Sequence, residues 1–525
     1  MDLIAAIALA VTAIVLMITQ IKWDLQMMQQ NSYRNERFLR WLRSSGECTG
    51  AGRLTLLVML VLALSTFMRS WIVMLILVAA IVIKCIVAWR KKYKKPLVMT
   101  KRVWRLALTE IILLIAVIAA VAVARRDIMA IGVTALIAAT FSYVFTLAVN
   151  WLLKPVEKAI NNSFINDAKR LLAQMPDMKI VAITGSFGKT STKHYLNRIL
   201  SEKYSVLMTP GSFNTPMGVV RTVRELMQPY NDLFIVEMGA KNIGDIREIC
   251  DIVHPQIGII TAVGEQHLES FKTIENVQRT KFELIDALPA DGLAVLNDDF
   301  EYVANRPVSN VKAIRYSVDT ARQSDFHAQN ITYSPTGTRF SIVGQGISID
   351  LETKLVGECN VSNLTAAVIV ALKLGVPEAK IRYAVSRIEQ VEHRLSIKRT
   401  PAGLTIIDDA FNSNPVGSRM ALDVLAQMTT GKRIIITPGM IELGSKQEYY
   451  NRLLGEQIAS AADVAIVVGQ YNREAITEGI AQANSNGACK VHTVDTFPLA
   501  QSLMLSIAHA GDTVLYENDL PDSFK

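Results

Sequence analysis

The sequence predicts a polytopic α-helical membrane region followed by a soluble α/β part. The soluble part has a central domain built on a phosphate-binding loop (P-loop) and a C-terminal, doubly wound, Rossmann-like domain. Three observations support this. Five apolar runs occupy the first 155 residues, a strand, glycine loop and helix pattern begins near Lys179, and strands alternate with helical runs after residue 393. Such alternation is typical of parallel sheets covered by helices.

The apolar runs are the evidence for the membrane region, which we place at 1–155. A bilayer core of about 30 Å needs roughly 20 residues of helix, so each run is long enough or nearly so, and we expect five transmembrane helices. The second run is short, which leaves open a re-entrant hairpin with the third. The first run lacks a small-residue cleavage site, so we interpret it as an anchor. The runs are 2–21, 54–68, 71–89, 106–124 and 128–153.

Basic residues predict the orientation of these helices. "YRNERFLRWLR" follows the first run and "RKKYKKPLVMTKRVWR" follows the third. The positive-inside rule places both on the cytoplasmic side, so with five spans the chain after Trp151 is cytoplasmic. Up to Pro155 there are 19 Lys and Arg against 6 Asp and Glu, whereas the remainder has 36 against 41. The positive charge therefore belongs to membrane-flanking segments and argues against a nucleic-acid partner for the soluble part.

The stretch "VAITGSFGKTSTKHYL", which begins at Val181, predicts the phosphate-binding loop. "KIVAI" is typical of a buried strand, "TGSFGKTS" of a glycine-bearing turn, and "TKHYLNRILSEKY" of a helix. Loop N–H groups and the helix N-terminus would bind phosphate oxygens, with Lys189 at the β/γ-phosphates and Thr190 on Mg²⁺. Ile183 replaces the first glycine of the longer pattern, which leaves the form G-x-x-G-K-T. The candidate nucleotide-binding residues here are Gly185, Ser186, Gly188, Lys189, Thr190 and Ser191.

Seven further sequence blocks follow the loop: "TPGSFNTPMGV", "FIVEMGA", "ITAVGEQHLESFKTIENVQRTKFELI", "GECNVSNLTAA", "VEHRLSI", "IIDDAFNSNP" and "PGMIELG". In this order they resemble the Mur ligase family, ATP-dependent enzymes that form amide bonds in peptidoglycan precursor synthesis. "DDAFNSNP" is most similar to the branch that adds D-alanyl-D-alanine. The resemblance covers about 176–525. It implies a central ATPase domain over 176–392 and a C-terminal domain over 393–525, which a linker over 156–175 joins to the membrane region.

The resemblance also implies roles for single residues. It implies that Glu237 and His267 bind the metal with Thr190, and that Lys281 carries a carbamate placed for the metal. The implied catalytic set is Lys189, Glu237, His267 and Lys281, and further nucleotide contacts fall on Asn360, Asn363, Arg394, Asp409 and Asn412. Each has a structural alternative, since a strand-end carboxylate, a packed histidine, a solvated lysine or a turn asparagine needs no ligand.

Amide formation explains why these residue types would be needed. A carboxylate needs a better leaving group than oxide, and phosphorylation by ATP provides an acyl phosphate, which the amine then attacks. Mg²⁺ and Lys189 would offset the repulsion between the carboxylate and the γ-phosphate. We expect ATP to lie between the two domains and their closure to complete the site.

Two departures from the family leave the substrates open. The membrane region stands where the family has a small soluble domain that binds UDP, and the chain ends in "VLYENDLPDSFK" rather than a Lys-Gly-Ser-Arg-type turn. We expect a ligase at the inner face of the cytoplasmic membrane that joins an amino acid or short peptide to a lipid-linked or UDP-linked carboxylate acceptor. The alternatives are a membrane-anchored D-alanyl-D-alanine-adding muramyl peptide ligase and a non-catalytic nucleotide-binding scaffold.

Overall fold

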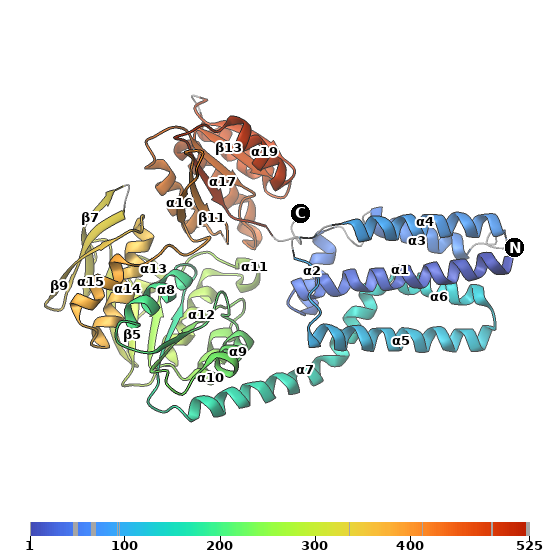
Figure 1. Ribbon diagram of the computed structural model, residues 1–525, viewed down its shortest axis with the longest axis horizontal. Helices are drawn as coiled ribbons and strands as arrows, with labels where there is room; N and C mark the ends of the chain where they lie inside the picture. The colour runs from blue at the N-terminus through green and yellow to red at the C-terminus, as the bar shows by residue number, and fades with distance from the viewer. Residues whose placement is uncertain are drawn as a thin grey trace. The chain divides into compact units, whose positions relative to one another are not determined.

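Two compact units make up the chain in the computed structural model (Figure 1). The first comprises Met1–Asn161 with Leu520–Lys525, and the second comprises Asn162–Asp519. The segment predicted as a linker, 156–175, continues a helix that ends at Ala173. The residues that the structure describes are 2–45, 51–64, 70–91, 93, 95–334, 337–411, 413–484 and 487–520.

The first unit is a bundle of apolar helices. α1 packs against α4 and α6, and α3 and α5 also pack on α6. The core is made of small and aliphatic side chains such as Leu9, Ala13 and Leu136, whereas Ile76 and Val87 are exposed on the outside. An apolar outer surface over a packed core is what a lipid-facing bundle requires. The helices are α1 (Asp2–Gln30), α2 (Asn35–Ser44), α3 (Ala51–Leu64), α4 (Trp71–Arg90), α5 (Lys101–Arg125), α6 (Ile128–Thr140) and α7 (Ser142–Ala173).

Fewer candidate spans are found among the described residues than the five predicted from the sequence. Leu3–Gln30, Trp71–Arg90 and Lys101–Arg125 are long and apolar enough to cross a membrane, and the pair α6 and α7, bent by 72°, is a fourth candidate. The difference lies in α3, which has 14 residues and therefore covers only about 21 Å at 1.5 Å per residue. Residues 65–68 of that predicted span lie outside the described residues.

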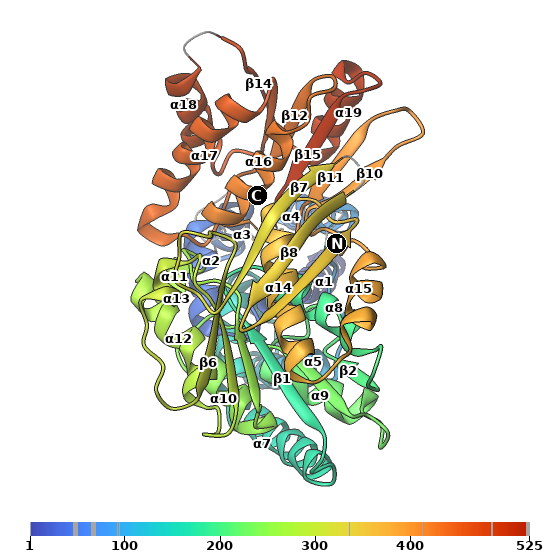
Figure 2. The same cartoon turned by 90° about the vertical axis from the view of Figure 1, so that its left-hand side faces the viewer.

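The second unit begins with a nine-stranded sheet of order β2-β3-β1-β4-β5-β6-β7-β8-β9 (Figure 2). Pairing is parallel as far as β7, and β7 to β9 form antiparallel hairpins. Alternate residues of β1 face opposite layers, with Val181 and Ile183 against α8 and α14, and Ile180 and Ala182 against α9, α10 and α12.

The elements of this central domain are β1 (Lys179–Thr184), α8 (Lys189–Leu200), β2 (Val206–Met208), α9 (Pro216–Leu226), β3 (Leu233–Glu237), α10 (Asp245–Val253), β4 (Ile257–Ile260), α11 (Leu268–Phe271), α12 (Ile274–Asp286), β5 (Leu293–Asn297), α13 (Glu301–Ala304), β6 (Lys312–Ser317), β7 (Phe326–Ser334), β8 (Gly337–Gly344), β9 (Ile347–Thr353), α14 (Glu358–Lys373) and α15 (Glu378–Ser386). Because β1 lies between β3 and β4, the loop after β1 opens at the point where strand order reverses, which is where ligands bind in such sheets.

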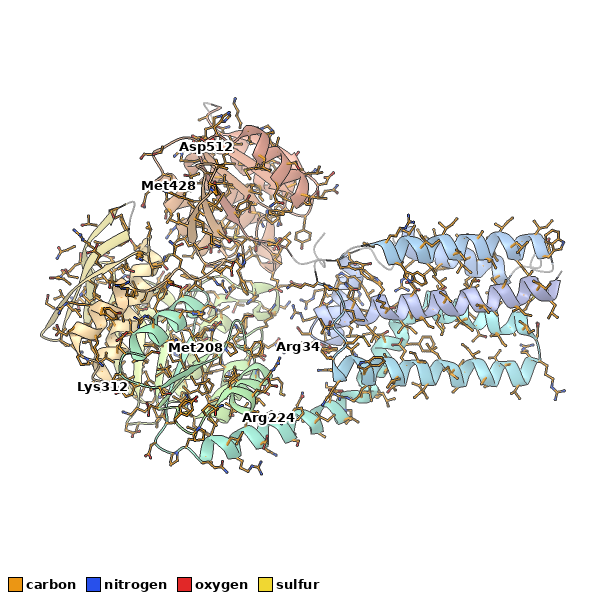
Figure 3. The ribbon with its side chains drawn as sticks, in the orientation of Figure 1. Arg34, Met208, Arg224, Lys312, Met428 and Asp512 are labelled. Atoms are coloured by element: carbon orange, nitrogen blue, oxygen red, sulfur yellow. The ribbon has the colours of Figure 1, made fainter. Side chains whose placement is uncertain are left out.

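The end of α7 is fixed to this domain by an arginine of α9. Arg224, labelled in Figure 3, donates from Nε to Asp167 Oδ2 over 2.7 Å, and its guanidinium carbon lies 4.3 Å from the centroid of the Phe164 ring. Ala168 of α7 is fully buried in the same core as Val220 of α9. The last turns of α7 are therefore part of the second unit.

The C-terminal domain contains a six-stranded sheet of order β10-β11-β15-β12-β13-β14, in which only the β10–β11 pair is antiparallel. Two separate apolar clusters cover its two faces, one with α16, α17 and α18 and the other with α19. This confirms the predicted doubly wound fold. Its elements are β10 (Ser396–Arg399), β11 (Thr405–Asp409), α16 (Pro415–Ala426), β12 (Arg433–Thr437), η2 (Gly444–Lys446), α17 (Gln447–Ala461), β13 (Val464–Val468), α18 (Arg473–Ala483), β14 (Lys490–Val494), α19 (Phe497–Ile507) and β15 (Thr513–Glu517).

Candidate nucleotide and metal site

The predicted phosphate loop joins β1 to α8. Gly188 has a φ of 81°, which favours glycine, and a Cβ there would lie 2.5 Å from Asn363 Oδ1. At Gly185 a Cβ would lie 2.1 Å from Thr261 Oγ1. Both glycines are therefore needed because the loop backbone lies directly against the end of β4 and against α14.

Side chains also hold the loop in place. Ser186 Oγ donates to Gly264 O over 2.9 Å and accepts from Gly264 N over 3.0 Å. Thr261 Oγ1 donates to Phe187 O. Ser186 was predicted to bind the nucleotide, but its buried hydroxyl fixes the loop to the segment after β4. A loop held at both ends keeps its N–H groups in place for phosphate oxygens.

Lys189 begins α8 and folds back over the loop. Its Nζ donates to Gly185 O over 2.6 Å and to Ser186 O over 3.2 Å. Burial lowers the pKa of Lys189 to about 8. The negative charge of Glu237 opposes this shift, and the positive charge of Arg394 adds to it. Neutral carbonyls are weaker partners for an ammonium group than phosphate oxygens are, so this lysine fits a nucleotide phosphate. Thr190 follows it in the first turn of α8.

Glu237 ends β3 and is almost fully buried. Its Oε1 accepts from Asn214 Nδ2 over 2.9 Å, and its Oε2 lies 3.0 Å from Lys193 Nζ without hydrogen-bond geometry. Burial alone would raise the pKa of Glu237, but Lys193 and Lys189 hold it below its ordinary value. A buried, ionised carboxylate oxygen with no hydrogen-bond donor among the described residues fits a hard cation such as Mg²⁺.

Lys193 is a residue that the sequence analysis missed. Its ammonium group is fully buried and donates to Gly211 O over 2.6 Å, besides its ion pair with Glu237. It stands four residues after Lys189 in α8, on the same face of the helix. That spacing from the phosphate-loop lysine is the signal that could have identified it.

Lys281 lies in α12 and is 2% exposed. Burial, with the neighbouring charge of Lys189, lowers the pKa of Lys281 well below its ordinary value. Burial of this kind favours the neutral amine over the ammonium ion, and the neutral amine is the form that reacts with CO₂. The environment therefore fits the predicted carbamate, which stays a prediction.

His267 was predicted to share a metal with Glu237 and Lys281. Its Nδ1 instead pairs with Oε2 of Glu442, from the C-terminal domain. Burial lowers the pKa of His267, while Glu442 opposes this shift and the charge of Lys281 adds to it. Among the described residues, no group of three or more His, Cys, Asp or Glu side chains could hold a metal. Lys281 lies within electrostatic reach of both His267 and Lys189.

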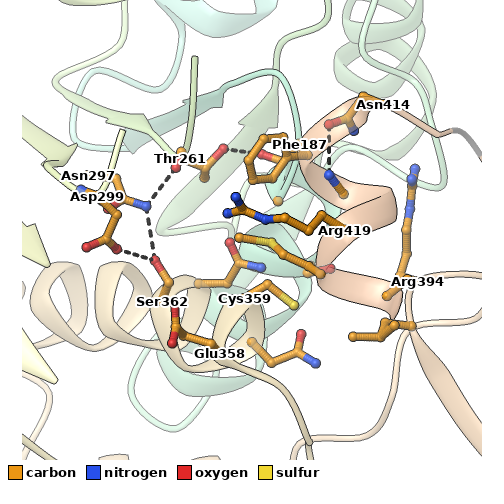
Figure 4. Close-up of a pocket in the computed structure, with 18 of the residues that line it drawn as sticks. Phe187, Thr261, Asn297, Asp299, Glu358, Cys359, Ser362, Arg394, Asn414 and Arg419 are labelled. Atoms are coloured by element: carbon orange, nitrogen blue, oxygen red, sulfur yellow. Dashed lines mark hydrogen bonds between the residues drawn. The ribbon is translucent and has the colours of Figure 1, made fainter. Parts of the chain in front are cut away.

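A pocket brings residues of the central and C-terminal domains together (Figure 4). Asn363 Oδ1 accepts from Thr192 over 3.2 Å. Asn360 is bonded at both ends of its amide, by Tyr195 OH at 2.7 Å and to Val356 O at 2.8 Å, which favours its structural alternative. Asn412 lies outside the described residues. The predicted residues in the pocket lining are Gly188, Ser191, Asn360, Asn363, Arg394 and Asp409.

The C-terminal domain contributes an arginine and a carboxylate to this pocket. The guanidinium of Arg394 lies 4.0 Å from the ring centroid of Phe411. Burial lowers the pKa of Arg394, and the negative charges of Asp409 and Glu237 oppose this shift. Asp409 Oδ1 accepts from Leu395 N over 3.0 Å, and burial raises the pKa of Asp409 to about 6. Arg394 thus lies within electrostatic reach of Glu237, which supports its predicted place at the phosphates.

The comparisons with known proteins agree with this geometry. The profile described as "Mur ligase middle domain" matches residues 183–371, and "Mur ligase, glutamate ligase domain" matches 393–516. The Escherichia coli UDP-N-acetylmuramoyl-tripeptide–D-alanyl-D-alanine ligase is 30% identical over 338 residues, which cover 64% of this chain and 72% of that enzyme. The chain belongs to the Mur ligase family. It is therefore an ATP-dependent amide-bond ligase by family, which confirms the resemblance read from the sequence.

Further Mur ligases extend this likeness. The Bacillus subtilis enzyme of the same name is 29% identical, over 54% of this chain and 60% of its own length. A crystal structure of MurF from Acinetobacter baumannii matches with a TM-score of 0.62 and 26% identity, over 68% of this chain and 77% of that one. MurF from Thermotoga maritima in complex with ADP has the same fold, with a TM-score of 0.61 at 22% identity, over 68% and 80%.

The pocket of this Mur ligase also contains polar residues that the sequence analysis did not name. Asn297 Nδ2 donates to Thr261 O over 2.9 Å and to Ser362 Oγ over 3.0 Å. Asp299 accepts from Val318 N over 3.0 Å (Figure 4 shows Asn297, Asp299 and Ser362 together). Asn297 and Asp299 lie at the carboxyl end of β5, in "LNDD". A polar cluster directly after a buried strand was the available signal.

Proposed function

We propose that this chain forms an amide bond between a carboxylate of a cell-envelope precursor and an amino acid or short peptide, at the inner face of the cytoplasmic membrane. The observation that carries the proposal is the convergence of Lys189, Glu237, Lys281 and Arg394 around the end of β1, where their charges act on one another. Lys189 and Arg394 supply positive charge suited to a phosphorylated carboxylate, while Glu237 and the carbamate form of Lys281 would hold the metal. A nucleotide-binding scaffold would not need the buried lysine of α12.

Each residue has a defined part in this chemistry. ATP supplies the phosphoryl group that converts the carboxylate into an acyl phosphate. Lys189 and Arg394 stabilise the negative charge of the phosphates, and Glu237 and Thr190 would hold Mg²⁺. Asp409 reaches the same pocket from the C-terminal domain, so the two domains must be together for turnover.

Lys281 would act in its carbamate form. Its neutral Nζ attacks CO₂, a nitrogen–carbon bond forms as one carbon–oxygen π bond opens, and the proton leaves to solvent. This replaces a buried neutral amine by an anion within electrostatic reach of Lys189 and His267. A carbamate is also an oxygen ligand suited to Mg²⁺, and it would complete a metal set that the described side chains do not complete alone.

The helical bundle supports the membrane part of the proposal. Its long apolar helices expose large apolar side chains, including Ile76 and Val87. A bundle in the membrane would hold the ligase unit near membrane-bound substrates, so the first candidate acceptor is lipid-linked. A UDP-linked acceptor with D-alanyl-D-alanine is the second candidate, which the names of the relatives favour.

The test is phosphate release by the full chain in detergent with ATP and Mg²⁺. Acceptors are UDP-linked muramyl peptides and lipid-linked precursors, each offered with single amino acids or D-alanyl-D-alanine, and Lys189→Ala is assayed beside the wild type. Turnover only with a lipid-linked acceptor supports the first candidate. Turnover with a UDP-muramyl peptide and D-alanyl-D-alanine supports the second. No Lys189-dependent turnover with any pair contradicts a ligase function.

A further inference from the structure

Glu442, in the loop after β12, contacts two side chains of the central domain. Its Oε2 pairs with His267 Nδ1, and Lys241 Nζ donates to its Oε1 over 3.0 Å. The main chains meet as well, since Glu269 N donates to Glu442 O over 3.0 Å. Two segments that are 175 residues apart in the sequence are thus joined by three polar contacts.

The backbone shows that this contact is tightly held. Glu442 has a φ of 63° and His267 a φ of 54°, a region that few residues other than glycine adopt. Such conformations cost about 1–3 kcal/mol and persist where the surrounding structure fixes them. Both partners of the pair are therefore held in one orientation by their neighbours rather than by local preference.

The chemistry of the pair assigns the imidazole tautomer. Glu442 accepts from Lys241 Nζ through Oε1 and pairs with His267 Nδ1 through Oε2, so the carboxylate lies between two donors. Nδ1 of His267 must then carry the proton, which leaves the Nε2 lone pair available. A carboxylate bonded to one imidazole nitrogen while the other binds a metal is a recurrent arrangement, because it fixes the ring and raises its basicity.

We infer that Glu442 is a positioning residue that orients His267 for the metal, so that the metal site is complete only when the C-terminal domain is docked on the central domain. The inference rests on the proposed role of His267 as a metal ligand. It couples two events: docking of the C-terminal domain strengthens metal binding, and by linkage the metal stabilises docking by the same factor.

The test is the affinity of the full chain for Mn²⁺, a paramagnetic probe in place of Mg²⁺, by electron paramagnetic resonance with saturating ADP. Glu442→Ala should weaken Mn²⁺ binding by about 10- to 100-fold, the usual effect of removing such a partner. Glu442→Gln should recover most of the affinity, because its amide oxygen still accepts from Nδ1. At low Mg²⁺ the alanine variant should lose turnover, and excess Mg²⁺ should restore it.

The matched control is Tyr450→Phe. Tyr450 OH donates to Glu265 Oε1 over 2.8 Å, a second hydrogen bond between the same two domains that does not touch His267. This variant should bind Mn²⁺ as the wild type does. Equal losses in Tyr450→Phe and Glu442→Ala would mean that Glu442 contributes only to docking, and would overturn the inference. Circular dichroism of each variant establishes that it is folded.

His267→Ala separates this inference from the function on which it rests. If it weakens Mn²⁺ binding while Glu442→Ala does not, the inference is wrong and the proposed metal site stands. If His267→Ala binds Mn²⁺ as tightly as the wild type, the role of His267 as a ligand is wrong, and the inference fails with it. Lys189-dependent turnover of the wild type reports on the ligase function independently of both results.

Discussion

Buried charges occur in both units of this protein, and the two units treat them differently. In the bundle, Arg53 Nη2 lies 3.0 Å from Asp24 Oδ1, and Nη1 donates to Thr140 O over 3.1 Å and to Ala139 O over 3.3 Å. Ser142 also donates to Asp24. These contacts lie at the break between α6 and α7, where a bent helix leaves carbonyls without their usual partners.

In the ligase unit the buried charges are matched less completely. Glu237 Oε2 lies 3.0 Å from Lys193 Nζ but accepts no hydrogen bond among the described residues, and Lys189 donates to carbonyls of its own loop. The comparison separates two uses of buried charge. A group whose partners are all supplied by the protein stabilises the fold, whereas a group with weak or missing partners is prepared for a ligand.

The largest effect is expected at Lys189. Lys189→Ala removes the cation of the phosphate loop and should lower the rate of ATP-dependent turnover roughly 10³-fold or more, because charge stabilisation is the main device in phosphoryl transfer. Stability should change little, since the lysine is paired only with carbonyls. The measurement is phosphate release, with Lys373→Ala, an exposed lysine of α14, as the control. Normal turnover would remove Lys189 from the mechanism.

A change at Arg53 should lower the stability of the bundle, whereas a change at Lys189 should lower turnover. Arg53→Met leaves Asp24 buried without its cation and should destabilise the bundle by about 3–5 kcal/mol. Adding Asp24→Asn should recover part of this loss, because the uncompensated charge is gone. Thermal unfolding in detergent measures both variants, and the nucleotide affinity of the folded protein is the control. If the double variant is less stable than Arg53→Met, the pair is not the source of the effect.

The next prediction concerns whether the buried Lys281 takes part in the reaction. Lys281→Met keeps the volume and should lower turnover by about 10²-fold, the upper range for loss of one metal-site partner. Turnover of the wild type should also fall after CO₂ and bicarbonate are removed and recover when bicarbonate is added. A wild type that does not respond to bicarbonate would show that Lys281 acts as the free amine.

The smallest effect concerns pH. Because the pKa of Lys189 is lowered to about 8 without nucleotide, the loop loses its cation as the pH rises through 8. ATP affinity should therefore fall by up to about tenfold between pH 7 and pH 9, and binding at pH 9 should take up a proton. The folded-state pKa lies below the ordinary value of 10.5, so the contribution of this group to stability rises as the pH increases from about 8 towards 10.5. Calorimetry in two buffers measures the proton uptake.

The sequence by itself determined the elements whose signals are local. The β-branched strand, glycine loop and helix form a local pattern, and that pattern predicted the loop after β1. The contacts that require glycine at Gly185 and Gly188 come from Thr261 and Asn363, far along the chain, and were not part of that pattern. Seven ordered blocks identified the family. The apolar runs identified the bundle, since long stretches without charge leave few alternatives.

Only the tertiary structure decided which distant groups meet and how deeply each is buried. It paired Glu442 with His267, placed Lys193 beside Glu237, used the amide of Asn360 for Tyr195 and Val356, and bent the last apolar run between Thr140 and Ser142. Spacing along the chain could single out Lys193, but it does not show which distant group each of these side chains meets. The sequence lists the charged groups, but their roles depend on the partners and the exclusion of water that folding alone supplies.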